Sequence, residues 1–286
     1  MIRKCLFPAA GYGTRFLPAT KAVPKEMLPI LTKPLLQYAV EEALSAGISN
    51  MAIVTGRGKR SIEDHFDNAF ELEYQLSGSS KEHYLDDIKS VIEKSTFTYV
   101  RQRHMLGLGH AILTGEPLIG NEPFAVILAD DLCFDDEINI LKKMTEIYKK
   151  YKCSVVATEE IDLVDTDKYG VISGDLIDGT DNTFRVKDMI EKPNTNDLIN
   201  FKPNESKKNT FMGIIGRYIL TPDIFNILKN IKPMEGNEIQ ITDALRTQAS
   251  QGKVIAYKFK GKRFDCGSVK GYLAATNYLA KHQGLL

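Results

Sequence analysis

The sequence predicts an α/β fold built on an open, mostly parallel but mixed, Rossmann-like sheet that is flanked by helices. Strand-like apolar runs alternate with helical patterns along the first half of the chain, and this alternation favours a parallel sheet covered by helices. The run Phe124–Ala129 is apolar at every position, which is typical of a strand buried on both faces. The chain has 286 residues, 43% of them hydrophobic, so it can bury a core large enough for such a sheet.

The first half supplies strands and helices in alternating order. A strand at Lys4–Phe7 ends at Pro8 and leads into a turn that contains glycine. Residues 34–47 fit a helix, because Pro34 suits its first turn and Gly47 its C-terminal exit. The other elements expected here are strands at Met51–Thr55 and Cys153–Thr158 and a helix at Glu137–Tyr151.

The second half is expected to extend the same sheet, so that residues 1–286 form a single domain. The segment 162–182 is rich in Asp and Gly and fits loops around a short strand at Gly170–Ser173. Val254–Lys260 alternates apolar and polar residues, which predicts a half-exposed strand near a sheet edge. The remaining expected elements are strands at Thr183–Ile190 and Met212–Leu220, a polar loop at Asn200–Asn209, and helices at Glu238–Gln251 and Tyr272–Gln283.

The balance of charge limits the possible partners. Lys and Arg together number 37, as do Asp and Glu, so the formal net charge is zero. A neutral chain has no overall field to attract nucleic acid or an anionic membrane, and we expect neither as a partner. Any anionic ligand must then be held by a few cations placed close to it.

Targeting and cysteine patterns favour a cytoplasmic protein. The longest apolar runs are far shorter than the ~18 residues that span a bilayer. The N-terminus lacks the long apolar segment of a secretory signal. We expect scattered reduced thiols, with a metal set or two disulfides as the alternatives. The cysteines are widely spaced and contain no CxxC pair: Cys5, Cys133, Cys153 and Cys266.

A glycine-rich segment directly follows the first strand and reads AAGYGTR from residue 9 to residue 15. Gly11 and Gly13 allow a sharp turn and a close approach of backbone N–H groups to phosphate. A dinucleotide fingerprint would need a third glycine where Phe16 stands, and the Gly-Lys-Ser/Thr of a P-loop is absent. The loop therefore predicts anion binding outside these two familiar motifs.

Cations follow the glycines at Arg15, Lys21 and Lys25, interleaved with three prolines in GTRFLPATKAVPKEMLP. Proline stiffens a loop and so reduces the entropy that the loop loses when it grips a ligand. Several cations on a stiff loop suit a polyphosphate. The alternative is an ordinary tight turn followed by a solvated basic loop.

Two aspartates, Asp130 and Asp131, come directly after the buried strand. Ligands of open α/β sheets bind at that edge, and carboxylates that leave a buried strand need a partner. Asp265, in RFDCG, is the other acidic candidate. Mg²⁺ is typically held by one or two carboxylates together with substrate phosphate oxygens. A helix cap or a turn is the alternative, and spacing alone does not bring Asp265 to Asp130.

These motifs together resemble a known family. The pattern GxGTRxxPxTKxxPKExLP is similar to the loop of the sugar-1-phosphate nucleotidylyltransferases, and its ATKAVPKEMLP continuation resembles the bacterial UTP–glucose-1-phosphate uridylyltransferases. The likeness extends over the chain through an ordered series of segments: TGRGKRSIEDHFD (55–67), RQRHMLGLGHA (101–111), LADDL (128–132), KYGVI (168–172), IEKP (190–193), GRYIL (216–220), NEIQITDAL (237–245) and KRFDCGSVKGYL (262–273).

The resemblance implies a reaction. UTP and α-D-glucose 1-phosphate give UDP-glucose and pyrophosphate when the sugar phosphate attacks the α-phosphorus of UTP in line, assisted by Mg²⁺. The phosphate oxyanion is already a nucleophile near neutral pH, so no general base is needed, which fits the lack of a Ser/His/Asp or Cys/His set. The implied catalytic cations are Arg15 and Lys25 on the leaving triphosphate and Lys192 between the two phosphates, and the implied Mg²⁺ ligands are Asp130 and Asp265.

The resemblance also implies where the substrates bind. Residues 1–160 form a nucleotide-binding half, and residues 161–286 a half for sugar binding and oligomerisation that includes a smaller β extension. The implied partner is a second copy of the chain, in a homodimer or homotetramer. The implied nucleotide-binding residues are Ala10, Gly11, Gly13, Glu26, Gln102, Gly107 and Asp131, and the implied sugar-binding residues are Gly170, Glu191 and Gly213.

Two positions depart from the family pattern, and several alternative functions stay open. Tyr12 stands where smaller apolar residues are common, and Asn237 where a second glycine is usual. The nearest alternative is the same chemistry with dTTP and glucose 1-phosphate. A metal-dependent glycosyltransferase would not need the basic loop, a non-catalytic sensor should lack some of these charges, and a dehydrogenase should have the third glycine.

Overall fold

The computed structural model describes residues 1–135, 139–198, 201, 210–232 and 238–286. The strands are β1 (Lys4–Pro8), β2 (Pro29–Ile30), β3 (Lys33–Pro34), β4 (Asn50–Thr55), β5 (Thr96–Arg101), β6 (Phe124–Ile127), β7 (Asp131–Phe134), β8 (Ser154–Asp162), β9 (Gly170–Leu176), β10 (Thr183–Glu191), β11 (Thr210–Leu220), β12 (Val254–Lys258) and β13 (Lys262–Asp265). The α-helices are α1 (Leu35–Ser45), α2 (Arg60–His65), α3 (Phe70–Leu76), α4 (Asp86–Lys94), α5 (Gly107–Thr114), α6 (Glu116–Ile119), α7 (Ile140–Tyr151), α8 (Asp223–Asn230), α9 (Ile241–Ser250) and α10 (Val269–His282).

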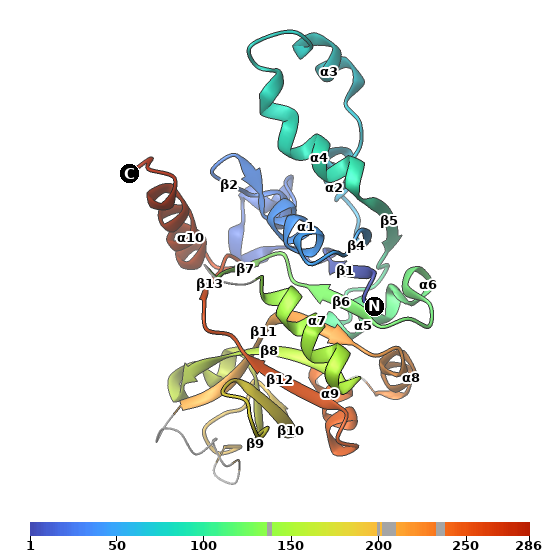
Figure 1. Cartoon of the computed structure of the whole chain (residues 1–286), viewed down its shortest axis with the longest axis vertical. Helices are drawn as coiled ribbons and strands as arrows, with labels where there is room; N and C mark the ends of the chain where they lie inside the picture. Colours follow the sequence, from blue (N-terminus) through green and yellow to red (C-terminus); the bar gives the residue numbers. More distant parts are fainter. Residues whose placement is uncertain (136–138, 199–200, 202–209, 233–237) are drawn as a thin grey trace.

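Among the described residues, one nine-stranded sheet runs through both halves of the chain in the order β5-β4-β1-β6-β11-β8-β12-β10-β9 (Figure 1). The strands β5, β4, β1 and β6 are mutually parallel. β11 runs antiparallel to both β6 and β8, β12 is parallel to β8, and β10 is antiparallel to β12 and β9. The predicted mixed α/β sheet flanked by helices is therefore confirmed.

Helices cover both faces of this sheet, which explains why its central strands are apolar throughout. On one face, α1 and α7 pack on Cys5 and Phe7 of β1 and on their neighbours in adjacent strands. On the other face, α5, α8 and α9 pack on Leu6 and its neighbours. Successive side chains of a strand point to opposite faces, so burial on both sides requires an unbroken apolar run.

The prediction that Val254–Lys260 forms a half-exposed strand near a sheet edge was wrong, because the strand is buried on both faces. The strand β12 lies inside the sheet, between β8 and β10. Val254 and Ala256 enter the core on one face, whereas Ile255 and Tyr257 enter the core on the other. The apparent alternation reflects only the polar residues from Lys258 onward, where the strand ends.

Other differences concern lengths and omissions. The strand predicted at Phe124–Ala129 ends at Ile127, and the short strand expected at Gly170–Ser173 extends to Leu176. No separate element was predicted for α2 to α4 or for β5. The helices α3 and α4 project from one end of the molecule (Figure 1). The start of the helix expected at Glu137–Tyr151, most of the loop Asn200–Asn209, and Asn237 lie outside the described residues.

The ribbon of β7 and β13 brings remote acidic residues together. Its antiparallel register places Asp265 opposite Asp131, which is the residue that follows Asp130. The helix α10 begins directly after this ribbon, where the Ser268 hydroxyl accepts a hydrogen bond from the Gly271 N–H and so caps the helix. Within the described ranges, no helix combines the length and apolar character needed to cross a membrane.

A buried ion pair supports the end of β6 from behind. The Arg217 side chain is 1% exposed and donates to both carboxylate oxygens of Glu42, at 3.0 Å from Nε and 2.7 Å from Nη2. Its Nη1 donates to the backbone carbonyl of Asp131 at 2.7 Å. Helix α1, which carries Glu42, is thus tied through Arg217 to the backbone of the second aspartate.

This pair generates a stability prediction. Glu42→Ala leaves the Arg217 guanidinium buried without a compensating charge, and we expect a loss of about 3–5 kcal/mol in the free energy of unfolding. Urea denaturation measures the change. Glu41→Ala, which removes a more exposed partner of Lys33, is the control and should cost less than about 1 kcal/mol. A Glu42→Ala protein as stable as the control would contradict this role of the pair.

Candidate functional site

A cavity of about 270 Å³ opens at the carboxyl end of β6, where ligands of open α/β sheets bind. One end of the cavity carries Arg15, Asp130 and Asp265, and the other carries Gly170 and Glu191. The structure thus brings residues from the glycine-rich loop, from β7 and β13, and from β9 and β10 to one space. Arg15 and Asp265, the members of this set that are furthest apart in the sequence, are separated by most of the 286-residue chain.

At the acidic end, each carboxylate faces a cation of the first loop. Lys25 Nζ lies 2.5 Å from Asp130 Oδ2, and Arg15 Nη1 lies 3.5 Å from Asp265 Oδ2. Gly267 lies at the centre of the group. A Cβ added there would stand 2.5 Å from Arg15 Nη2, 2.8 Å from Asp130 Oδ2 and 2.9 Å from Asp265 Oδ1. The cluster therefore surrounds a space that only glycine leaves open.

Mutual attraction shifts the pKa of both members of the Lys25–Asp130 pair. Burial acts to raise the pKa of Asp130, but the positive charge and hydrogen bond of Lys25 outweigh it and hold this pKa below the ordinary aspartate value. Burial likewise acts to lower the pKa of Lys25, and the carboxylates of Asp130 and Glu26 raise it above the ordinary lysine value. Both groups are charged at neutral pH.

The loop geometry depends on Gly13, which has a positive φ of 66°. A Cβ at this position would stand 3.0 Å from the β-carbon of Lys25. Glycine is favoured here both by the left-handed backbone and by the close packing of Lys25. Gly11 and Ala10 lie on the same turn, and Ala10 lines a second cavity described below.

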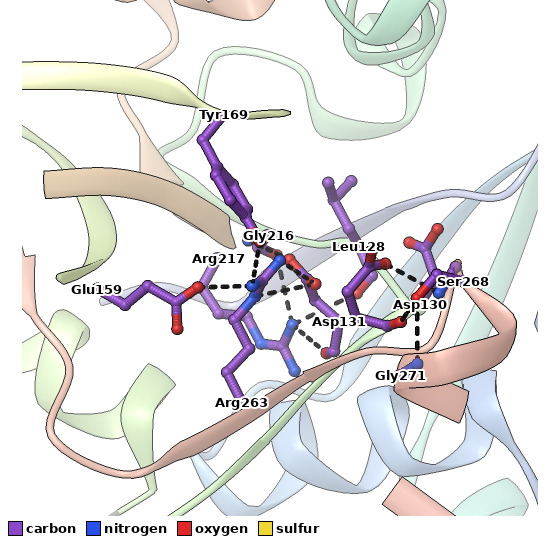
Figure 2. Close-up of polar contacts among 12 residues, drawn as sticks. Leu128, Asp130, Asp131, Glu159, Tyr169, Gly216, Arg217, Arg263, Ser268 and Gly271 are labelled. Carbon is purple, nitrogen blue, oxygen red and sulfur yellow. Dashed lines mark hydrogen bonds and ion pairs between the residues drawn. The ribbon is translucent and has the colours of Figure 1, made fainter. Parts of the chain in front are cut away.

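Both carboxylate oxygens of Asp131 are bound by groups of the protein (Figure 2). Its Oδ2 accepts a hydrogen bond from the Gly216 N–H at 2.8 Å, and its Oδ1 accepts from Arg263, with Nη2 at 2.8 Å. Burial raises the pKa of Asp131, opposed by the positive charge of Arg263. The two adjacent aspartates thus have different surroundings, and Asp130 is the one beside the basic loop.

The opposite end of the cavity presents the hydrogen-bonding groups of Glu191 and Thr242 beside Gly170. Glu191 Oε2 accepts from the Thr242 hydroxyl at 2.5 Å, and a Cβ at Gly170 would stand 3.2 Å from the same oxygen. Lys192 follows with a positive φ of 44° and a half-exposed side chain, its Nζ 3.8 Å from Glu191 Oε1. Gly213 packs against Ile161 and Tyr169 next to this end and is not among the residues lining the cavity.

A second cavity, of about 410 Å³, lies on the other side of the basic loop and is lined by Ala10, Gln102 and Lys59 among others. Gln102 Nε2 lies 3.4 Å from the Gly107 carbonyl oxygen and 2.8 Å from His110 Nδ1. Gln102 and Gly107, which were both predicted to bind the nucleotide, therefore lie side by side.

Glu26 lies behind this second cavity and is 2% exposed. Its Oε2 accepts from Lys59 Nζ at 2.6 Å, whereas its Oε1 has no hydrogen-bond partner in the described structure. Burial raises the pKa of Glu26, opposed by the charges of Lys59 and Lys25. A buried carboxylate oxygen without a partner is costly, and a donor on a ligand or a water could satisfy it.

The acidic end has donors suited to a hard divalent cation. Asp130 Oδ2 and Asp265 Oδ1 both lie within 3 Å of the space at Gly267, and carboxylate oxygen is the donor that such cations prefer. In the part of the chain that the structure describes, no group of three or more His, Cys, Asp or Glu side chains could hold a metal ion by itself. Two carboxylates fit an ion whose remaining ligands are phosphate oxygens and water.

Sequence reasoning missed three residues of the site. Arg263 was passed over although it stands two positions before Asp265, and Lys59 and Thr242 lie within segments that were quoted only as part of a resemblance. A signal was available for Arg263, because a buried strand that ends in two aspartates needs more than one cation. Thr242 gave no signal, since its role depends on its contact with Glu191.

The fold and the site are typical of nucleotide-binding α/β proteins with a glycine-rich anion loop. The sequence model of the nucleotidyl transferases matches residues 6–282, and the chain belongs to this family. A UTP–glucose-1-phosphate uridylyltransferase of Pseudomonas aeruginosa is 61% identical over 279 residues, which cover 97% of this chain and 96% of that protein.

Solved structures agree with this assignment. The crystal structure of an apo UDP-glucose pyrophosphorylase is 60% identical with a TM-score of 0.91 and covers 99% of this chain and 100% of that chain. A UDP-glucose pyrophosphorylase complexed with UDP-glucose is 58% identical with a TM-score of 0.87 and the same coverage.

The lowered pKa of Asp130 generates a prediction for stability against pH. Its ionised form is favoured in the folded state, so its contribution is present above the ordinary aspartate pKa of about 3.9 and is lost as pH falls toward the folded-state value. Asp130→Asn should therefore lower the free energy of unfolding by about 1–3 kcal/mol at pH 7. The difference from the wild type should shrink below pH 4, as measured by urea denaturation across this range.

The control for this prediction is Asp178→Asn, which changes an exposed turn residue and should stay within about 0.5 kcal/mol of the wild type. A destabilisation of Asp130→Asn that is equally large at every pH would show that packing, and not charge, holds the pair together.

Proposed function

We propose that this protein transfers a uridylyl group from UTP to α-D-glucose 1-phosphate and releases UDP-glucose and pyrophosphate. The observation that carries the proposal is the convergence of Arg15, Lys25, Asp130 and Asp265 at one end of a cavity whose other end offers hydrogen-bonding groups. The names of the similar proteins support the two substrates.

The chemistry needs positioning and charge compensation. The attacking oxygen of the sugar phosphate is already an anion near neutral pH, so the protein has no proton to remove from it. The barrier comes from bringing two anions together and from charge that develops on the leaving pyrophosphate. Positioning of this kind is worth up to about 7–11 kcal/mol. Fixed cations supply the remaining stabilisation without having to reorganise.

Three cations divide this work in our proposal. Arg15 and Lys25 bind the triphosphate of UTP, part of which leaves as pyrophosphate. This requires Lys25 to exchange Asp130 for a phosphate oxygen. Lys192 contacts both the attacking phosphate and the α-phosphate. The left-handed backbone of Lys192 and its position beside Glu191 support this role, because strained residues concentrate at functional sites.

The two cavities give the substrates separate places. We assign the uracil to the second cavity, where a side-chain amide such as Gln102 can both donate to and accept from the base edge. Gly107, Glu26 and the loop glycines complete the nucleotide site in this proposal. We assign the hexose to the end of the first cavity beside Gly170, with Glu191 accepting from sugar hydroxyls. Gly213 supports that end from the neighbouring strand.

Nucleotidyl transferases generally use a divalent metal ion. We propose Mg²⁺, with Asp130 and Asp265 as its protein ligands. When bound there, the ion would neutralise phosphate charge and help to fix the triphosphate relative to the attacking oxygen.

Asp131 was predicted to bind the nucleotide. Because its two carboxylate oxygens are occupied by Arg263 and by the Gly216 N–H, we propose instead that it positions its neighbour Asp130.

We also propose the division of labour and the setting. Residues 1–160 carry most of the nucleotide site, and residues 161–286 carry the sugar site and the contacts between copies. Exposed Val269 and Leu273 on α10 support a homodimer or homotetramer built partly on this helix. The cysteines are all free thiols, which suits the reducing cytoplasm.

The substrate pair is tested directly. The purified protein is incubated with Mg²⁺, glucose 1-phosphate and each of UTP, dTTP, CTP, ATP and GTP, and pyrophosphate release is measured. We expect UTP to give a kcat/KM at least ten-fold above any other nucleotide. A higher value with dTTP would replace the proposed substrate by the nearest alternative. No pyrophosphate from any nucleotide, together with release of UDP when UDP-glucose and a sugar acceptor are supplied instead, would indicate a glycosyltransferase.

Gly267→Ala tests the cluster itself. The added methyl group occupies the space shared by Arg15, Asp130 and Asp265, so we expect kcat/KM to fall by about 100-fold or more, equivalent to about 2.7 kcal/mol. Arg15, Asp130 and Asp265 must all shift to admit the methyl group, so the melting temperature is measured alongside to establish that the variant is folded. Gly179→Ala, at an exposed turn remote from this cluster, is the matched control for kcat/KM. Full activity of the folded Gly267→Ala protein would place the reaction elsewhere.

A further inference from the structure

We propose that Arg263 is a positioning residue that fixes the two ends of the active cavity relative to each other. It holds Asp131 at the acidic end and Tyr169 at the sugar end, and through them it orients the groups that act on the substrates. This inference rests on the proposed function and extends it to a residue that touches neither reacting phosphate in our assignment.

The contacts of Arg263 are unusually complete for one side chain (Figure 2). Its Nε and Nη2 lie 3.0 Å and 2.8 Å from Asp131 Oδ1. Its Nη1 lies 2.6 Å from Glu159 Oε1 and 3.0 Å from the Tyr169 hydroxyl, and the guanidinium stacks 5.0 Å above the Tyr169 ring. The side chain is 8% exposed. A planar fork of this kind fixes directions that the point charge of a lysine cannot fix.

At the acidic end, Arg263 influences the positions of both proposed metal ligands. Asp131 is the chain neighbour of Asp130, and Arg263 lies two residues before Asp265 on β13. The register of β7 and β13 pairs Asp265 with Asp131 and Arg263 with Cys133. A shift of the guanidinium therefore shifts the ribbon that carries the two carboxylates.

At the sugar end, the connection runs through Tyr169 to Lys192. The Lys192 backbone N–H donates to the Tyr169 carbonyl at 3.0 Å, and this bond holds Lys192 in its left-handed conformation. Tyr169 also directly precedes Gly170, which lines the cavity. One guanidinium thus joins the acidic end to the residue that we assign to the attacking phosphate.

A purely structural role makes a different prediction. A buried ion pair can often be replaced without loss of stability, so stability alone would not require an arginine here. Residues that orient metal ligands typically change metal affinity or activity by about 10–100-fold when they are replaced. The positioning role therefore predicts changes in kinetic constants that exceed and do not follow changes in stability.

The experiment uses the intact protein and compares Arg263→Lys with Tyr169→Phe. Arg263→Lys keeps the charge and loses the fork, and we expect kcat to fall about 10–100-fold and the Mg²⁺ concentration for half-maximal rate to rise about 10-fold. Tyr169→Phe removes only the hydroxyl contact. We expect it to alter kcat or the KM for glucose 1-phosphate about 3–10-fold, with an unchanged Mg²⁺ requirement, because it touches one arm of the network.

Two further measurements separate positioning from folding. In the double variant, the effect of Tyr169→Phe should largely disappear, because the contact that it removes is already lost in Arg263→Lys. Guanidinium chloride at low millimolar concentration should raise the rate of Arg263→Ala several-fold and leave the wild type unchanged. Lys262→Met, on the same strand with its side chain over the Tyr278 ring, is the control and should keep wild-type constants.

The outcomes are distinct. Wild-type kinetic constants in folded Arg263→Lys, or equal and independent effects of the two changes, would overturn the positioning role while leaving the proposed function intact. If Arg263→Lys does not fold, Tyr169→Phe decides, and unchanged constants in that variant overturn the role. Failure of the wild type to release pyrophosphate from any nucleotide would overturn the proposed function, and the positioning role with it.

Discussion

Two adjacent carboxylates leave the end of one buried strand, and most of the site follows from the need to neutralise them. Burial disfavours the charged form of a carboxyl group, and two neighbouring negative charges disfavour each other further. Asp130 is compensated by Lys25, and Asp131 by Arg263 together with the Gly216 N–H. These partners come from the first loop, from β13 and from β11. The same requirement therefore draws three remote segments to the carboxyl end of β6.

The two aspartates acquire different properties from this arrangement. The pKa of Asp130 lies below its ordinary value because of Lys25, whereas burial raises the pKa of Asp131. Asp130 stays beside cations that can turn toward a ligand, and Asp131 is fixed by a buried guanidinium and a backbone amide. Environments that separate two like groups commonly mark a division of roles. Here one carboxylate is free to change partners and the other holds the framework still.

The ion pairs of the first loop also bear on how substrates enter. Lys25 and Arg15 already point at carboxylates, so they are ordered before any phosphate arrives, which lowers the entropy cost of binding. A triphosphate competes with Asp130 and Asp265 for the same cations. The exchange is favourable only when the carboxylates find another positive partner. Nucleotide and divalent ion should therefore bind with mutual reinforcement in the proposed reaction, since each supplies what the other displaces.

Local pattern predicted the first half of the fold well and said less about the meeting of distant residues. The strand before the glycine loop and the helix near residues 34–47 were predictable because proline, glycine and apolar spacing act locally. The internal position of β12 was not predictable. Its first four residues are buried on both faces and its last residue is a partly exposed lysine, and such a sequence resembles a half-exposed strand. The encounter of Asp265 with Asp130 depends on the register of β7 and β13, which no local pattern encodes.

The cavity itself arises from an irregularity in β11, the long strand that joins the two ends of the site. β11 pairs with β6 near its C-terminal end and with β9 near Gly213. β11 also pairs with β8, and this pairing contains a bulge. The four residue steps from Ile214 to Tyr218 in β11 lie opposite the shorter segment from Thr158 to Val156 in β8. Ile214, Gly216 and Tyr218 line the cavity at this departure from regular pairing. Irregular pairing of this kind redirects side chains beside functional sites. In this protein it lets the Gly216 N–H bind Asp131 while the flanking residues form a wall, so one strand both supports the acidic end and sets its separation from the sugar end.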